Sequence, residues 1–316
     1  MTHGSLVISL DFELLWGVFD KVSWEKQEAY FLNTRQVIPE ILKCFDNHNI
    51  SCTWATVGML FNENWDEWNE NSPLLQPGYK EPRLSAYKFG KKIQFSKTEK
   101  LCFAPDLIKL IKETPKQEVA THTYSHYYCL EPGQTEEHFK ADIQMAVNLA
   151  SKFGSKLTSL VFPRNQYNSS YLEICKGMGI QNIRSNPCNW YWKDIQKDTL
   201  LQKIFRTSDA YLGPMDKSYN LKKESTNGLL EQRASRFFRP VSGVSVLNKL
   251  RLKRVLKEME ESAKKGEIYH LWWHPHNFGS DPVRSMEELN IIARTFNKLN
   301  QQYGFQSKNM DELAQS

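Results

Sequence analysis

The chain has 316 residues, of which 40% are hydrophobic, and a formal net charge of +5 at pH 7. This length suits one large α/β barrel or two ordinary domains, and the apolar content is enough for a hydrophobic core. No run of about 18 uncharged apolar residues is present, which excludes a membrane span, and the mild charge does not indicate nucleic-acid binding. The first ten residues lack a basic region and a cleavable apolar core, so we expect no signal peptide.

Short apolar runs alternate with helical patterns along nearly the whole chain. We expect strands at 6–10, 51–57, 117–120, 156–162, 181–184 and 267–273. We expect helices at 25–47, 105–113, 135–153, 169–178, 247–265, 283–302 and 309–314, the first of them in two pieces or kinked at Pro39. Strands that alternate with helices predict a parallel sheet covered by helices.

Two stretches interrupt the alternation. Between 62 and 97 the periodicity is lost, although the segment contains Trp65 and Trp68, and a connection of this length without structure predicts a functional loop or lid over the substrate site. The stretch 186–245 cannot be assigned to strands; its Trp190-Tyr191-Trp192 run fits core packing better than stacking on a sugar. The six cysteines include no Cys-x-x-Cys pair, which favours reduced thiols in a cytoplasmic protein.

Two histidines, His122 and His126, directly follow the 117–120 run. A turn of helix would place residues four apart on one face, where two imidazoles can share a divalent metal. The alternative is that they are two surface or half-buried histidines without a metal, since two histidines four residues apart are common by chance. Further polar residues follow other expected strands, and in barrels of this kind the active site lies at the C-terminal rim of the strands.

Asp11 and Glu13 come at the end of the first strand, separated by one residue. In an extended chain both carboxylates point the same way and can enter one site. Two histidines and one carboxylate leave coordination positions open for water or substrate; zinc is the first choice, with cobalt, manganese or nickel as alternatives. The second carboxylate is then free to act as a base. The alternative is an ordinary helix start or a solvated loop.

Arg164 and the pair His274 and His276 follow the fourth and the last expected strands. A guanidinium at the rim could hold a carboxylate through paired hydrogen bonds, or Arg164 could be an ordinary surface arginine. An imidazole can donate a proton to a leaving amine near neutral pH. We expect one of the two histidines to have a structural role instead.

Four segments together resemble, in order, the motifs of the polysaccharide deacetylases (carbohydrate esterase family 4, the NodB homology domain). They are Ser9-Leu10-Asp11-Phe12-Glu13, His122-x-x-x-His126, Phe162-Pro163-Arg164 and Trp273-His274-Pro275-His276. The resemblance covers about residues 5 to 313. It implies a distorted (β/α) barrel, formed by one catalytic domain over residues 1–316 with an insertion at about 62–97, and metal-dependent removal of acetyl groups from sugars.

The resemblance also implies residue roles. The common pattern of the family has two adjacent aspartates, whereas here Phe12 occupies the second place and we assign the ligand role to Glu13. The family's arginine usually precedes the proline, whereas Arg164 follows Pro163. With these departures, the implied catalytic residues are Asp11 as base, Arg164 orienting it and His274 as acid; the implied metal ligands are Glu13, His122 and His126; and the expected substrate contacts are His276, Asn277, Tyr127 and Trp16.

We therefore expect a hydrolase that removes an acetyl group from an N-acetylated sugar. Because no export signal is visible, a cytoplasmic nucleotide-linked or lipid-linked precursor fits better as substrate than a mature cell-wall polymer. Two alternatives remain. Some relatives of this fold hydrolyse cyclic amides such as allantoin, and some of those lack metal. A non-catalytic sugar-binding relative would keep the rim and lose turnover.

Overall fold

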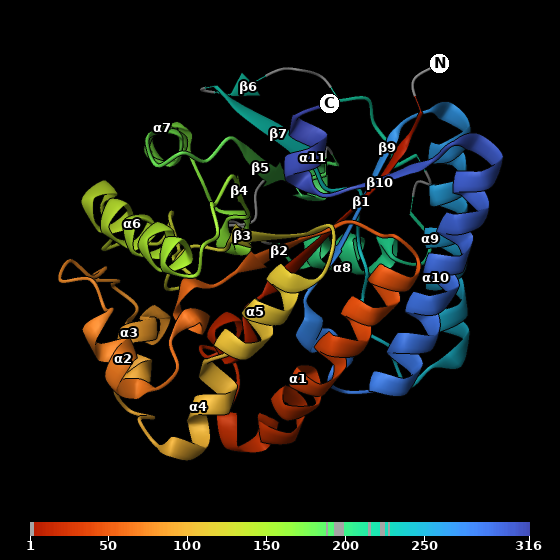
Figure 1. The fold of residues 1–316 in the computed structure, drawn as a ribbon. Helices are drawn as coiled ribbons and strands as arrows, with labels where there is room; N and C mark the ends of the chain where they lie inside the picture. The colour runs from red at the N-terminus through yellow and green to blue at the C-terminus, as the bar shows by residue number, and fades with distance from the viewer. Residues whose placement is uncertain (1–2, 188, 193–198, 214–215, 222–224, 227) are drawn as a thin grey trace.

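The computed structural model describes residues 3–187, 189–192, 199–213, 216–221, 225–226 and 228–316. One sheet runs through it in the order β6-β7-β5-β4-β3-β2-β1-β9-β8, and β10 pairs with β1 (Figure 1). The parallel strands are β1 (Ser5–Phe12), β2 (Cys52–Thr56), β3 (Gln117–Thr121), β4 (Ser159–Leu160), β5 (Asn182–Ser185), β7 (Leu229–Arg233), β8 (Arg236–Phe237), β9 (Ile268–Trp273) and β10 (Gln306–Lys308). The short β6 (Ser225–Thr226) is antiparallel to β7.

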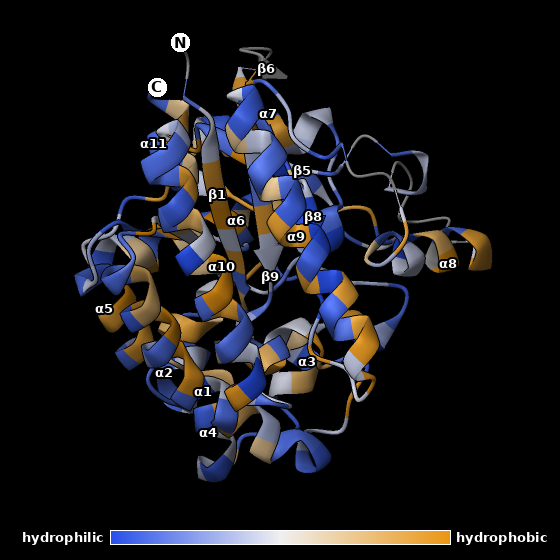
Figure 2. Cartoon of the chain, turned by 90° about the vertical axis from the view of Figure 1, so that its right-hand side faces the viewer, coloured by the Kyte–Doolittle hydropathy of each residue, from blue (hydrophilic) through white to orange (hydrophobic). Residues whose placement is uncertain are grey.

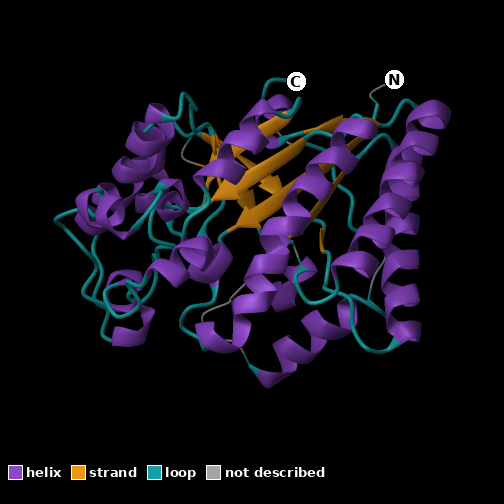
Figure 3. Ribbon diagram, turned by 60° about the horizontal axis from the view of Figure 1, so that its bottom comes forward, coloured by secondary structure: helices purple, strands orange, loops and turns teal. Residues whose placement is uncertain are grey.

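The sheet closes on itself between β7 and β8. Only Ala234 and Ser235 separate these strands, and the Ala234 N–H donates to the Ser185 carbonyl over 2.9 Å, while the Ser235 N–H donates to the His270 carbonyl over 2.8 Å. One extended segment therefore pairs first with β5 and then with β9. Figure 3 shows the strands at the centre with helices around them. The expected distorted (β/α) barrel is confirmed.

The outer helices occupy the expected places. They are α1 (Trp24–Asn47), α5 (Pro105–Glu113), α6 (Glu136–Lys152), α7 (Ser169–Gly177), α9 (Ser245–Lys265), α10 (Pro282–Tyr303) and α11 (Met310–Ala314). Of the two expectations at Pro39, the division into two helices is wrong, since α1 continues through this residue as one helix; the kink stays a prediction. The apolar face around Pro39, with Ile38 and Ile41 fully buried, offsets the one hydrogen bond that proline removes.

The stretches without periodicity also contain helices. Residues 62–97 hold α2 (Trp65–Glu70), α3 (Ala86–Gly90) and the start of α4 (Ser96–Cys102), which corrects the expectation of an unstructured loop. Trp65 and Trp68 are buried and pack on Trp16, so they belong to the core. The later stretch contains α8 (Leu200–Asp209). The short 3-10 helices are η1 (Leu14–Gly17), η2 (Gly58–Phe61), η3 (Pro82–Leu84), η4 (Pro163–Asn165), η5 (Trp190–Trp192) and η6 (Pro275–Phe278).

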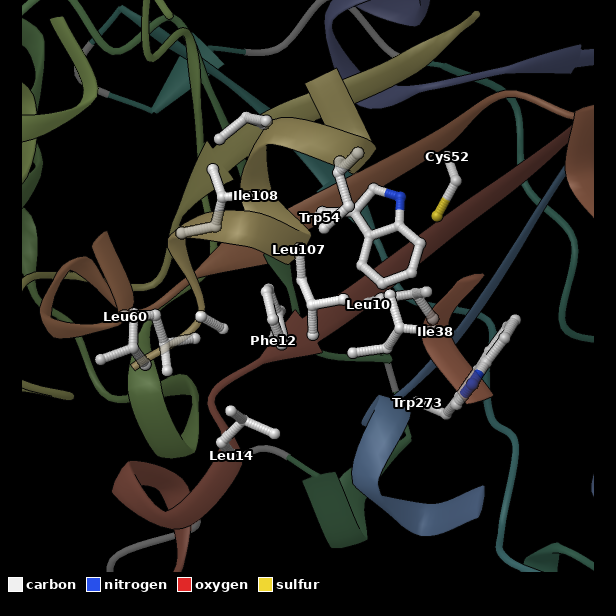
Figure 4. Packing of buried hydrophobic residues seen from close by; sticks show 14 of the residues in the cluster. Leu10, Phe12, Leu14, Ile38, Cys52, Trp54, Leu60, Leu107, Ile108 and Trp273 are labelled. Carbon is white, nitrogen blue, oxygen red and sulfur yellow. The ribbon is translucent and has the colours of Figure 1, made fainter. Parts of the chain in front are cut away.

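Alternation along β1 separates the core from the interior of the barrel. All eight residues of β1 are buried. Leu10 and Phe12 lie in the hydrophobic cluster with Ile38 of α1 and Leu107 of α5 (Figure 4). Because successive side chains of a strand point to opposite faces, Asp11 is directed away from this cluster and into the barrel.

Two expectations from composition can be compared with the fold. No helix in the described ranges is both long and apolar enough to cross a membrane. Cys44, Cys52, Cys102, Cys129 and Cys175 are buried free cysteines, and Cys188 lies outside the described residues.

Candidate active site

A cavity of about 1010 Å³ lies at the C-terminal ends of the strands. It brings together residues from β1, β3, β5, β9 and the loops that follow them, as the rim argument predicts. The polar residues of its floor are Asp11, Glu13, His122, His126, Arg184, His274 and His276. Its aromatic wall consists of Phe162, Trp192, Phe237 and Trp272.

Glu13 faces both histidines of the His-x-x-x-His motif. Its Oε2 lies 3.4 Å from Nε2 of His122 and 3.2 Å from Nε2 of His126, and the ligand atoms of the three residues all lie within 4.8 Å of one another. All three side chains are buried. Burial alone would raise the pKa of Glu13, but His274, His122 and His126 hold it well below its usual value. Glu13 is therefore a carboxylate at neutral pH.

This arrangement fits a divalent metal. The Nδ1 of His122 lies 2.7 Å from the Val161 carbonyl, which can only accept, so Nδ1 carries a proton and Nε2 is the nitrogen that faces Glu13. The Nδ1 of His126 lies 3.1 Å from the Tyr128 hydroxyl. Outer partners on the far nitrogens are typical of metal-binding histidines. Among the described residues, Oε2 of Glu13 has no hydrogen-bond partner although it is buried, which leaves three inward ligand atoms for a cation.

The two histidines meet in a loop, not on a helix. Thr123 and His126 have left-handed φ values of 61° and 55°, and no helix covers this stretch. Asp142 of α6 holds the loop: its carboxylate accepts from the Tyr124 N–H over 2.7 Å, and from both the N–H and the hydroxyl of Ser125. The expected helical turn is wrong because these bonds fold the loop instead.

Asp11 is fixed by Arg184, a residue that the sequence reasoning placed on a strand without assigning it a role. The guanidinium donates to both carboxylate oxygens, over 2.7 and 2.8 Å, and lies 4.2 Å from the Trp272 ring centroid. It also donates to the Ser9 hydroxyl over 3.0 Å. Burial would raise the pKa of Asp11, but Arg184, His122 and His274 keep it below its usual value. A charged residue at the C-terminal end of an expected strand was the signal that could have identified Arg184.

Arg164 does not orient Asp11, so that prediction is wrong. Its guanidinium donates to Asp20 over 2.5 Å and lies 3.6 Å from Glu131 and 4.0 Å from the Tyr128 ring centroid. The chain takes a left-handed turn at Arg164, with φ of 54°. The side chain therefore lines the outer wall of the cavity, while β5 sends Arg184 to the floor.

His274 lies between the two carboxylates. Its Nε2 is 3.7 Å from Asp11 and 3.6 Å from Glu13, and its side chain is 24% exposed. His276 stacks on it with ring centroids 4.9 Å apart and is buried. Burial and the neighbouring His274 lower the pKa of His276 to about 3. Of the two, His274 is the imidazole that opens into the cavity.

Two of the four expected substrate contacts are wrong. Trp16 is fully buried, donates to the Cys102 carbonyl over 2.6 Å and stacks on Trp68. Tyr127 is fully buried, and its hydroxyl donates to Gln134 over 2.9 Å. Both aromatic rings lie in the hydrophobic core. His276 and Asn277 do line the cavity, and their contact with substrate stays a prediction.

The insertion and the unassigned stretch both reach the cavity. Glu81, Arg83 and Leu84 come from the segment between α2 and α3. Trp192 and Arg239 come from the stretch 186–245. Sequence reasoning missed Arg239 as a lining residue because it could not place the strands around it.

Comparison with known proteins agrees with this geometry. The family model described as polysaccharide deacetylase matches residues 14–183, more than half of the chain. The chain therefore belongs to the polysaccharide deacetylase family. A search of curated proteins finds no match.

Solved structures show the same fold at low sequence identity. A polysaccharide deacetylase described as putative, from Mycobacterium smegmatis, is 12% identical with a TM-score of 0.59, over 99% of this chain and 90% of the other. A probable polysaccharide deacetylase from Pseudomonas aeruginosa is 10% identical with a TM-score of 0.57, over 98% and 89%. Puue allantoinase is 9% identical with a TM-score of 0.54, over 98% and 88%. The fold is thus shared by proteins that are named for different activities.

Proposed function

We propose that this chain is a metal-dependent hydrolase that removes the acetyl group from an N-acetylated sugar. The observation that carries the proposal is the buried set Glu13, His122 and His126 beside the Asp11–Arg184 pair. Membership of the polysaccharide deacetylase family supports it. Zinc is the first choice for the metal, with cobalt, manganese or nickel as alternatives.

Each residue of the floor has a distinct part in this proposal. A cation held by Glu13, His122 and His126 would supply Lewis acidity toward the acetyl carbonyl and lower the pKa of nearby water. Asp11, kept ionised by Arg184, accepts the proton of the attacking water. His274 donates a proton to the sugar nitrogen as the C–N bond breaks, because an amine does not leave as an anion.

The wall of the cavity suits a sugar that carries a phosphate. Trp272 and Phe237 present aromatic surface for a sugar ring. Within the described residues, the Arg239 guanidinium donates to the Arg206 carbonyl, over 3.4 Å, and to the Thr207 hydroxyl, over 3.3 Å, and has no carboxylate within ion-pair distance. An arginine without a carboxylate partner favours an anionic group on the substrate. A nucleotide-linked or lipid-linked sugar precursor in the cytoplasm meets this requirement.

Acetate release from N-acetylated sugars tests the proposal. The purified protein, supplied in turn with zinc, cobalt, manganese and nickel, is assayed on UDP-N-acetylglucosamine and on N-acetylated oligosaccharides, with Asp11→Asn as the inactive control. Acetate release by the wild type alone supports the proposal. Ring opening of allantoin without acetate release would make the chain a cyclic-amide hydrolase. Sugar binding without hydrolysis under every metal would make it a binding protein.

A further inference from the structure

Helix α8 presents its apolar side to solvent. Its exposed large hydrophobic residues are Leu200, Leu201, Ile204 and Phe205, with exposed fractions of 76, 56, 52 and 44%. Its polar residue Asp209 faces the protein, where it is buried and accepts from the Lys217 ammonium over 3.0 Å. A surface helix normally buries its apolar stripe and exposes its polar face. An exposed stripe of this size is typical of a surface that binds a partner or a membrane.

The first half of α9 adds positive charge beside this stripe. Residues 245–257 include five basic residues and no acidic one. Lys249, Lys253 and Lys257 are exposed, one turn apart, and none lies within 4 Å of a described carboxylate. Val246, in the turn before Lys249, and Leu250, directly after it, are exposed at 64% and 39%.

The chain directly after α8 contacts α9. Arg254 of α9 donates to the carbonyl of Tyr211, over 3.4 Å, and to that of Gly213, just beyond the end of α8. Between these two lies Leu212, which is 80% exposed. Figure 2 shows α8, with orange residues, at the right-hand edge of the molecule, and α9 nearer the middle of the view. We call this surface the α8–α9 face; it consists of Leu200, Leu201, Ile204, Leu212, Val246, Lys249, Leu250 and Lys253.

The α8–α9 face borders the catalytic cavity. Arg239 lines the cavity and donates to the carbonyl of Arg206 and the hydroxyl of Thr207, both on α8. Trp192 also lines the cavity, and the Arg206 guanidinium lies 5.4 Å from its ring centroid. A molecule held on the face therefore lies next to the opening of the cavity.

We propose that the α8–α9 face docks on an anionic membrane surface and brings the cavity to a saccharide carried by a lipid phosphate. The aliphatic side chains would enter the boundary between headgroups and acyl chains, and the lysines would face the lipid phosphates. Leucine and isoleucine beside lysines that have no partner among the described carboxylates suit a lipid surface, because lysine is depleted at the core of protein interfaces. The carried saccharide as substrate rests on the proposed function, whereas the docking itself does not.

Vesicle sedimentation tests the docking. The full chain is mixed with vesicles of phosphatidylcholine alone or with added phosphatidylglycerol. We expect sedimentation with the anionic vesicles only. Lys249→Glu combined with Lys253→Glu should weaken binding by about 30-fold or more, since each lysine near an anionic surface contributes about a factor of five. Leu201→Ser combined with Ile204→Ser should weaken it by about tenfold or more. All four side chains are exposed, so the variants should fold, and circular dichroism checks this.

Matched variants elsewhere separate the face from general surface effects. Leu74→Ser with Leu75→Ser removes two exposed leucines from the insertion, and Lys91→Glu with Lys92→Glu reverses two exposed lysines there. Neither should change binding. Equal losses in these controls, or no preference of the wild type for anionic vesicles, would overturn the proposal. A dimer in light scattering that Leu201→Ser with Ile204→Ser dissociates would instead make the face a contact between two copies of this chain.

Activity assays keep this proposal distinct from the proposed function. On an acetamido sugar linked to a lipid phosphate in vesicles, the α8–α9 variants should lose about tenfold or more of the rate, while their rate on a water-soluble acetamido sugar should not change. Vesicle binding without turnover of either substrate would refute the proposed function and leave the docking intact. Turnover of the soluble sugar without vesicle binding would refute the docking alone.

Discussion

The floor and the outer wall of the cavity each contain an arginine paired with an aspartate, yet the two pairs differ. On the floor, Arg184 is 1% exposed and binds both oxygens of Asp11. On the wall, Arg164 is 24% exposed and shares its charge between Asp20 and Glu131. A buried pair leaves a costly unpaired charge when one partner is removed, whereas a partly exposed pair contributes little. The floor pair therefore holds Asp11 in one fixed, buried position, whereas the wall pair leaves Arg164 partly open to the cavity.

The largest expected effect follows from removing a ligand on the floor. His126→Ala should lose bound metal and activity together, because two ligands hold a divalent cation much more weakly than three. Metal analysis of the purified variant, beside acetate release, measures both. His138→Ala removes a half-buried histidine that caps α6, outside the cavity, and serves as the control. Full metal retention in His126→Ala would remove His126 from the ligand set. If Asp11→Asn empties the site and Glu13→Gln does not, the two carboxylates have exchanged roles.

The second largest effect is expected from removing His274, the proposed proton donor to the leaving amine. His274→Ala should lower kcat by about 10²–10⁴-fold on an acetamide, in line with general acid catalysis, and by much less on an activated aryl acetate, whose leaving group needs no proton. His276→Ala should change KM more than kcat. Both variants are measured on both substrates at several pH values. A leaving-group dependence in His276→Ala alone would reverse the assignment.

Removal of Arg184 tests how the floor holds its base. Arg184→Met takes away the main favourable charge beside Asp11, so the pKa of Asp11 should rise. The acid limb of the kcat/KM profile should therefore move to higher pH, since the base works only when deprotonated, and kcat should fall by about 10²-fold. Arg184→Lys keeps the charge and should move the acid limb less, which guards against a variant that fails to fold. An unchanged acid limb in both variants would show that Asp11 is not the base.

The matched change on the wall should have the smallest effect. Arg164→Met should raise KM by about tenfold or less and leave kcat and the acid limb unchanged, because the pair is partly exposed and does not touch Asp11. Arg83→Met tests the insertion at about 62–97, which we propose covers the substrate. It too should raise KM and leave kcat unchanged. A loss of kcat as large as that of Arg184→Met would remove the distinction between floor and wall.

The sequence predicted much of this arrangement because β1, β3 and β9 are short buried runs with a polar residue directly after them. This pattern predicted that the polar residues after these strands lie close together, and the structure places six of them in one cavity: Asp11, Glu13, His122, His126, His274 and His276. The pattern failed for Arg184, which lies within a strand, and for Arg164, whose direction depends on a left-handed turn that no periodicity reveals. Trp16 and Tyr127 were misplaced because an aromatic residue near a motif has the same composition signal in a core as at a surface.

The position of β1 has a consequence for how the protein is made. This first strand pairs with β9, from Ser5 opposite Ile268 to Leu10 opposite Trp273, and also with β10. Asp11 depends on Arg184, which is 173 residues away in the chain. Contacts of such long range form late in folding. During synthesis, β1 cannot pair with β9 and β10 until those strands have been made. In a refolding experiment, activity should therefore return later than most of the secondary structure does.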